Sequence, residues 1–72
     1  MIDDIRKQVK RIPFVPFSIR MSDGQEYPVP TVDHIYITPT GRRVIVADDE
    51  GVTVLLPVLH MSGIKQQKNG DS

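Results

Sequence analysis

Beyond its first dozen residues, the sequence is interrupted at short intervals by residues that favour turns, which limits it to short strands. Asp23-Gly24 lies between two alternating runs and is typical of a two-residue type I′ hairpin turn, with positive φ at both central residues. Further turns or corners are expected at 30–34, 39–41, 48–51 and 57–60. The sequence therefore predicts antiparallel strands joined by tight turns.

Between these turns lie runs that alternate between apolar and polar residues or are apolar on both faces. The strands expected from them are 17–21, 25–29, 35–38, 43–47, 52–56 and a short sixth strand at 61–65. The run at 43–47 is apolar on both faces, which favours a central position in a sheet. Pro28 has no N–H for a ladder, so the second strand is predicted at an edge or with this position facing away from its neighbour.

The N-terminal segment, residues 2–12, is predicted to form an amphipathic helix. Its apolar residues are spaced three, four and three apart and form one stripe, consisting of Ile2, Ile5, Val9 and Ile12. Acidic side chains near its start and basic ones near its end suit the helix dipole. Pro13 is expected to end the helix, because proline lacks an N–H and restricts the residue before it.

One helix followed by five or six short strands indicates a mostly β fold, a small antiparallel barrel or rolled sheet. The helix is expected to cap one end or cover an open edge. Residues 1–65 are expected to form one domain and residues 66–72 a disordered polar tail. The inward positions form the predicted core: Ile5, Val9, Phe17, Ile19, Val29, Ile35, Ile37, Val44, Val46, Val54 and Leu56.

The size of the chain favours self-association. A chain of 72 residues buries only about 60% of the surface that it exposes when unfolded. It contains no cysteine, so no disulfide or zinc finger supplements the core. A homo-oligomer, either a dimer or a ring, is therefore expected.

No sequence pattern typical of catalysis or of cofactor binding is present. The chain has no nucleophile elbow, no glycine-rich phosphate loop and no paired carboxylates at hydrolase spacing. The acidic stretch 48–51 fits an exposed turn better than a calcium loop, which needs alternating carboxylates over about twelve residues. His34 has only Asp33 beside it, on the opposite face of a strand, so a structural or surface role is predicted. No enzyme activity, cofactor, metal or small-molecule substrate is expected.

Neither a membrane span nor a secretory signal is expected. The longest apolar run, 54–59, is far shorter than the roughly 20 residues that span a bilayer. The N-terminal segment is acidic and then amphipathic, without the basic start and apolar stretch of a signal peptide. The expected location is the cytoplasm.

The distribution of charge favours a nucleic-acid interface only at local basic clusters. Nine Lys and Arg balance nine Asp and Glu, and this zero net charge argues against broad non-specific binding. Two basic clusters could contact phosphates, one near the predicted helix and one after the third strand. With His60, the candidate nucleic-acid contacts are Arg6, Lys7, Lys10, Arg11, Arg42, Arg43 and His60.

Three segments resemble a group of short, uncharacterised bacterial proteins. The pattern consists of a "PFxPF" start, a "DG" hairpin, a "PTGR" turn and an acidic hairpin, found here in the segments 13–24, 37–42 and 44–51. The resemblance covers roughly residues 5–65 and implies a shared fold, but this group carries no agreed activity.

The chain also resembles Sm-like RNA-binding proteins, which have an N-terminal helix, a bent five-stranded barrel and a ring assembly. The segment 58–64 is similar to the bacterial Sm-like segment that contains a Lys-His pair before a final strand, with Leu59 in place of the lysine. The Asp-x-x-Met-Asn loop of that family is absent. This resemblance implies an Sm-like shape and RNA binding in a ring, with His60 near the pore.

The sequence leaves three functions open. The first is a non-enzymatic, self-associating binding module whose partner the sequence does not identify. The alternative is an Sm-like RNA-binding ring that uses the basic clusters and His60. A third, more distant function is that of a small enzyme or regulator whose site is built at a subunit interface.

Overall fold

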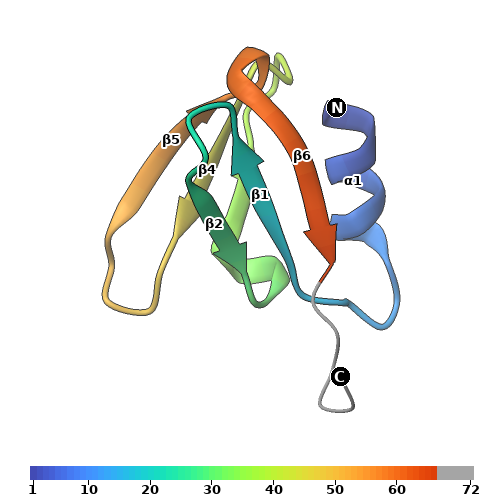
Figure 1. Ribbon diagram of the computed structural model, residues 1–72. Helices are drawn as coiled ribbons and strands as arrows, with labels where there is room; N and C mark the ends of the chain where they lie inside the picture. Colours follow the sequence, from blue (N-terminus) through green and yellow to red (C-terminus); the bar gives the residue numbers. More distant parts are fainter. Residues whose placement is uncertain (67–72) are drawn as a thin grey trace.

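The computed structural model describes residues 1–66 and shows one N-terminal helix and six strands arranged in two antiparallel sheets (Figure 1). Its elements are α1 (Ile2–Lys10), β1 (Phe17–Met21), β2 (Glu26–Val29), η1 (Val32–His34), β3 (Ile35–Ile37), β4 (Arg43–Ala47), β5 (Thr53–Pro57), η2 (Val58–His60) and β6 (Met61–Gln66), with η for a 3₁₀ helix. The mostly β class and the N-terminal helix are thus confirmed.

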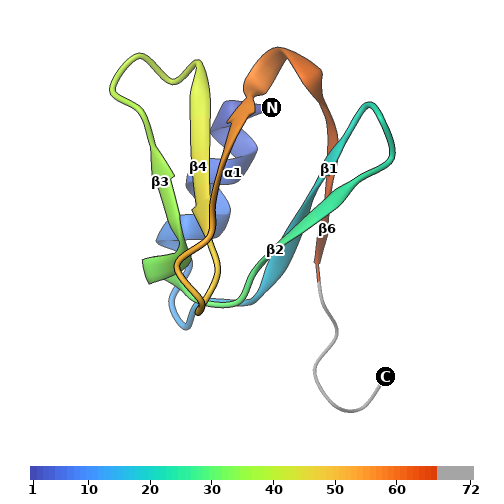
Figure 2. The same ribbon diagram turned by 90° about the vertical axis from the view of Figure 1, so that its left-hand side faces the viewer.

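The strands divide into two sheets of three. One sheet has the order β2-β1-β6 and the other the order β3-β4-β5. The chain passes between the sheets twice, through η1 and through η2. Figure 2 shows the two sheets facing each other with their edges toward the viewer. Strand pairing within residues 1–66 does not join the sheets into a closed barrel, because each 3₁₀ turn redirects the chain before the next strand can pair with the previous one.

The hairpin between β1 and β2 has a three-residue loop, not the two-residue type I′ turn predicted. Gly24 has a φ of +90°, but within residues 1–66 no residue other than glycine has positive φ, so Asp23 does not fit type I′. The N–H of Gly24 donates to Met21 O at 2.9 Å, and Met21 N–H donates to Gln25 O at 2.8 Å. This pattern is a type I turn followed by a left-handed glycine, the usual three-residue hairpin. Asp23 accepts the Gln25 N–H at 2.9 Å, which fixes the loop locally.

Replacing Gly24 with valine is expected to lower the free energy of unfolding by about 1 kcal/mol or more, because a β-branched residue is strained at positive φ. A β-carbon at Gly24 would meet no atom within 4 Å, so crowding adds nothing to this strain. Thermal unfolding measures the effect, and Gly63→Ala is the control because Gly63 also has open space and lacks positive φ. An unchanged melting temperature for Gly24→Val would contradict the turn assignment.

Helix α1 ends earlier than the sequence predicts. Its last residue is Lys10, and Arg11 already has extended angles of φ −67° and ψ 135°. Ile12, predicted to continue the apolar stripe, is 94% exposed. The correction follows from Pro13, which forces the residue before it into extended angles and so turns Ile12 away from the helix face.

The core lies between the sheets and under α1. Seven of the eleven predicted core residues are buried, and Val9, Ile35, Ile37 and Val54 are half-buried and pack against them. The buried apolar residues are Ile5, Phe17, Ile19, Met21, Val29, Val44, Val46 and Leu56. Alternation within each strand therefore identified the inward face correctly.

Several strand boundaries differ slightly from those predicted. Strand β4 spans 43–47 and lies between β3 and β5, so its predicted bounds and central position are both confirmed. Strand β5 is shifted by one residue and ends at Pro57. Gln66, predicted to start a disordered tail, is the last residue of β6, while residues 67–72 lie outside the described residues.

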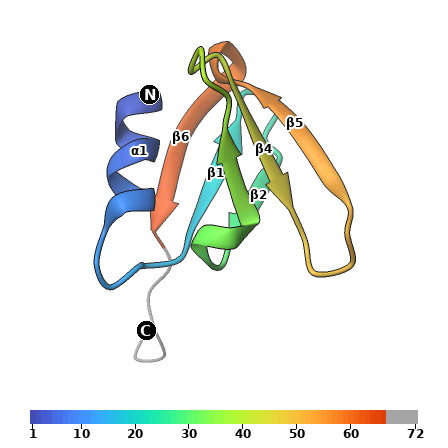
Figure 3. The same ribbon diagram turned by 180° about the vertical axis from the view of Figure 1, so that it is seen from behind.

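Helix α1 covers one open side of the two-sheet structure, as Figure 3 shows from behind. Ile5 is fully buried, and Gln66 Nε2 at the end of β6 donates to Gln8 Oε1 at 3.0 Å. Toward the other sheet, a β-carbon at Gly41 would lie 3.7 Å from Ile2 and 3.1 Å from Arg6. The helix therefore contacts β6 of one sheet and the β3–β4 turn of the other. No helix within residues 1–66 is long and apolar enough to cross a membrane.

Candidate functional site

The predicted basic clusters partly come together. A β-carbon at Gly41 would be 3.1 Å from Arg6 Nη2, so the Arg6 guanidinium lies against the turn that carries Arg42 and Arg43. All seven candidate contact residues are exposed: Arg6, Lys7, Lys10, Arg11, Arg42, Arg43 and His60. The structure thus brings one basic residue of α1 to the β3–β4 turn.

Arg42 and Arg43 border a surface hollow next to η2. The Val58 N–H donates to Arg42 O at 2.9 Å, which fixes the start of η2 against the β3–β4 turn. The hollow measures about 390 Å³ and is also lined by Gly41, Pro57 and Leu59. Leu59 is 94% exposed, so this hollow combines a positive rim with an uncovered apolar side chain.

His60 borders a different hollow. This second hollow lies between β5 and the β1–β2 turn and is lined by Asp23, Tyr27 and Leu55, among others. The backbone of His60 is fixed there, because its carbonyl accepts the Ser22 N–H at 2.7 Å. The seven predicted contacts therefore do not form one site, since His60 faces a hollow that carries an acidic residue.

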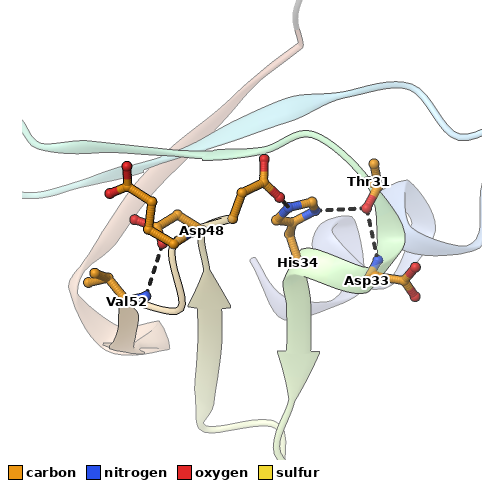
Figure 4. A network of polar contacts seen from close by, with 7 residues as sticks. Thr31, Asp33, His34, Asp48 and Val52 are labelled. Atoms are coloured by element: carbon orange, nitrogen blue, oxygen red, sulfur yellow. Dashed lines mark hydrogen bonds and ion pairs between the residues drawn. The ribbon is translucent and has the colours of Figure 1, made fainter.

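A polar network that the sequence did not predict surrounds the other histidine (Figure 4). His34 Nδ1 lies 2.7 Å from Thr31 Oγ1, and His34 Nε2 lies 2.7 Å from Asp49 Oδ1. Asp33, the only neighbour that the sequence places beside His34, is therefore not its partner; Thr31 and Asp49 are, and these contacts suit the structural role predicted for this histidine. The antiparallel pairing of β3 with β4, which sets Ile35 opposite Val46, brings residue 34 to the β4–β5 turn and is the signal that could have revealed Asp49.

The same network organises two turns. Thr31 Oγ1 accepts the Asp33 N–H at 3.2 Å and so caps η1. Asp48 Oδ1 accepts the N–H groups of Glu50 and Val52, each at 2.9 Å, and so shapes the β4–β5 turn (Figure 4). The His34–Asp49 contact ties these turns together, and the acidic stretch thus has the turn role expected for it. Among residues 1–66, no group of three potential ligands could hold a metal ion.

A hydroxyl, an imidazole and a carboxylate in series can activate a nucleophile, so the order of the groups matters. Here the Thr31 hydroxyl oxygen also accepts the Asp33 N–H and so caps η1. The His34 side chain is only 15% exposed, whereas that of Asp49 is 89% exposed. This arrangement leaves the imidazole as a half-buried link between two loops, with an exposed residue, Thr31 or Asp49, at each end of the series.

Replacing His34 with alanine is expected to lower the free energy of unfolding by about 1 kcal/mol, because the contacts with Thr31 and Asp49 are both lost. Amide hydrogen exchange in the β4–β5 turn should become faster, since the turn loses its link to η1. His60→Ala is the matched control, because that histidine is exposed. Equal exchange rates in the two variants would refute the linking role.

Strand β5 presents a free edge that carries exposed apolar side chains. It is the outer strand of the β3-β4-β5 sheet. Val52, immediately before it, is 57% exposed, and Leu55 within it is 55% exposed. Leu59 in η2, directly after it, is 94% exposed. The segment from 52 to 59 thus combines unpaired backbone with apolar side chains, two features that favour strand addition.

Two backbone hydrogen bonds show which groups of β5 are free. Asp48 N–H donates to Val52 O at 3.0 Å, and Val58 N–H donates to Arg42 O at 2.9 Å. Because hydrogen bonding alternates along an antiparallel pair, Val54 and Leu56 bond toward β4. The N–H and C=O groups of Thr53 and Leu55 therefore point away from the sheet.

Comparison of this sequence and structure with protein-family models, curated proteins and solved structures found no match.

Proposed function

We propose that this protein is a non-enzymatic binding module that works as an assembly of identical copies. The observation that carries the proposal is the free edge of β5 together with the exposed Val52, Leu55 and Leu59 on or beside it. A sheet edge of this kind either is blunted or recruits another chain. We place the assembly in the cytoplasm, as the sequence predicts.

The small core supports this proposal. Eight apolar side chains are buried within residues 1–66, and a domain of this size gains little stability from such a core alone. Covering apolar side chains along β5 would add burial that one copy lacks. The zero net charge does little to oppose association.

A non-enzymatic role accords with the polar network around His34. Its three side chains link loops, and the hydroxyl that would serve as a nucleophile caps η1. The hollow beside His60 is lined by Met21, by residues of β5 and also by Ser22 and Asp23. In residues 1–66 no hydrogen bond joins the Ser22 hydroxyl to the His60 imidazole, the contact by which a base activates a nucleophile.

Sedimentation equilibrium at micromolar concentration tests the proposal. We expect a mass that is a multiple of the 8.1 kDa monomer. Lowering the concentration should shift the equilibrium toward the monomer, because association follows mass action. A mass of 8.1 kDa throughout the micromolar range would overturn the proposal.

A second candidate function is RNA binding by an Sm-like ring in which the two sheets act as one barrel-like unit. The approach of Arg6 to Gly41, which directly precedes Arg42 and Arg43, favours it, because basic residues gathered at one surface can contact a phosphate backbone. A ring that co-purifies with RNA would support this function, and binding should weaken in an Arg42→Glu/Arg43→Glu variant. A nucleic-acid-free dimer would exclude the ring and leave the first proposal.

A further inference from the structure

We propose that two copies of this chain pair antiparallel along β5, with Leu55 of one copy opposite Leu55 of the other. The two β3-β4-β5 sheets then form one continuous six-stranded sheet with a two-fold axis between the leucines. This inference rests on the self-association proposed above and specifies its surface and geometry. The occupant is a second copy, because the backbone groups, apolar side chains and charges along β5 complement themselves in this arrangement.

The backbone groups of β5 suit this register. Leu55 has an N–H and a C=O that point away from β4, so the two opposed leucines can exchange two hydrogen bonds. The same register sets Thr53 opposite Pro57 of the second copy. Pro57 has no N–H, so its carbonyl can accept the Thr53 N–H but the Thr53 carbonyl receives no bond in return, and this pair forms one hydrogen bond of the usual two. The two-fold axis repeats this contact.

The exposed apolar side chains also match. Thr53, Leu55 and Pro57 share the outer face of the sheet, because the alternate residues Val54 and Leu56 point toward the core. The two Leu55 side chains, each 55% exposed in one copy, then cover each other.

The two ends of the segment complement each other as well. Val52 precedes β5 and Leu59 follows it, at the two ends of the strand. Antiparallel pairing therefore brings Val52 of one copy to η2 of the other. There the hollow of about 390 Å³ lies beside the exposed Leu59 and can receive an apolar side chain.

Charge favours antiparallel over parallel pairing. The acidic turn Asp48-Asp49-Glu50 precedes β5, and the pair Arg42-Arg43 lies at the other end, where Arg43 is opposite Pro57. Antiparallel pairing moves each acidic turn toward the arginine pair of the other copy, twice by symmetry. Parallel pairing would set the two acidic turns side by side, where like charges repel.

The other sheet edges are less suited than β5 to pairing with a second copy. In β2, Met21 N–H donates to Gln25 O, and the alternation from that bond leaves Glu26 and Pro28 pointing outward, so this edge has one outward N–H donor whereas β5 has two, on Thr53 and Leu55. Strand β3 has only three residues. The edge at β6 is approached by α1 through the Gln66–Gln8 bond. Strand β5 is therefore the edge best equipped for pairing.

A charge at the two-fold axis tests this geometry. Leu55→Asp would oppose two carboxylates in the dimer, so we expect the dissociation constant to rise on the order of 100-fold. The matched control is Tyr36→Asp, because Tyr36 is equally exposed, at 55%, and lies on the strand at the opposite edge of the same sheet. Sedimentation equilibrium should show weakened association for the first variant and parental association for the second.

Cross-linking provides an independent measurement, because the chain contains no cysteine. Opposed residues of a hydrogen-bonded antiparallel pair have Cα atoms about 5.5 Å apart, within the range of a disulfide. Leu55→Cys should therefore form a covalent dimer under mild oxidation, and Tyr36→Cys should not. The cross-linking of Leu55→Cys tests the interface even if the Leu55→Asp variant does not fold.

The outcomes separate the two proposals. A parent protein that stays monomeric overturns both self-association and its geometry. A parent that associates, with Leu55→Asp unaffected or Leu55→Cys not cross-linked, overturns the β5 interface and leaves self-association standing. Weakened association of Leu55→Asp together with cross-linking of Leu55→Cys supports the interface.

Discussion

Phe17→Ala is expected to lower the free energy of unfolding by about 3–5 kcal/mol, the range typical of a fully buried phenylalanine. Phe17 has no exposed surface and is the largest of the fully buried side chains in residues 1–66. It lies in β1, the central strand of its sheet, opposite Val29 on one side and Gln66 on the other. Its removal leaves a cavity next to three strands, and the short strands around it can close that cavity only partly.

Urea denaturation followed by circular dichroism measures this loss. A domain of this size is stable by only about 3–5 kcal/mol, so a large part of Phe17→Ala should be unfolded without denaturant. Tyr36→Ala is the control, because that aromatic ring is 55% exposed and its removal should change stability by less than about 0.5 kcal/mol. A cooperative transition of Phe17→Ala near the parental urea midpoint would contradict the assigned core.

Local periodicity explains what the sequence predicted well. In β1 the alternation of apolar residues sets Phe17, Ile19 and Met21 on one face, and all three are buried. The bounds of β4 and the edge position of β2 also follow from neighbouring residues, the first from its apolar run and the second from Pro28. Each of these features depends on geometry that repeats within a few residues.

The division into two sheets could not be predicted in the same way. The sequence marked corners at 30–34 and 57–60, and these became the 3₁₀ helices η1 and η2. After a corner of this kind, the next strand can either pair with the strand before it or join another sheet. The choice depends on how the two apolar faces pack against each other, which is a long-range property.

At the candidate site, the contact between His34 and Asp49 also could not be predicted from local sequence. These residues are 15 positions apart, and no local pattern links them. Only the register of β3 on β4 brings them together. Similarly, the free edge of β5 follows from the sheet order, whereas the residues of the strand alone indicate only its apolar character.

Ile5→Ala is expected to cost about 2–5 kcal/mol, because Ile5 is the fully buried residue by which α1 attaches to the core. The helix has nine residues, which is too short for a stable isolated helix in water. Once Ile5 is truncated, the remaining attachment consists of half-buried apolar residues such as Ile2 and Val9 and the Gln8–Gln66 hydrogen bond. The helix should therefore lose order before the sheets do, and helical circular dichroism should decrease at lower urea concentration than the signal of the strands.

Ile12→Ala provides a matched control, because the sequence placed Ile5 and Ile12 on the same stripe whereas the structure separates them. Ile12 lies beyond the end of α1 at Lys10 and is 94% exposed. Its truncation should change the free energy of unfolding by less than about 0.5 kcal/mol. If both variants lost several kcal/mol, Ile12 would be packed and the helix would extend to Ile12, as the stripe alone predicts. A difference of about 2 kcal/mol or more between them would locate the end of the packed helix before Ile12.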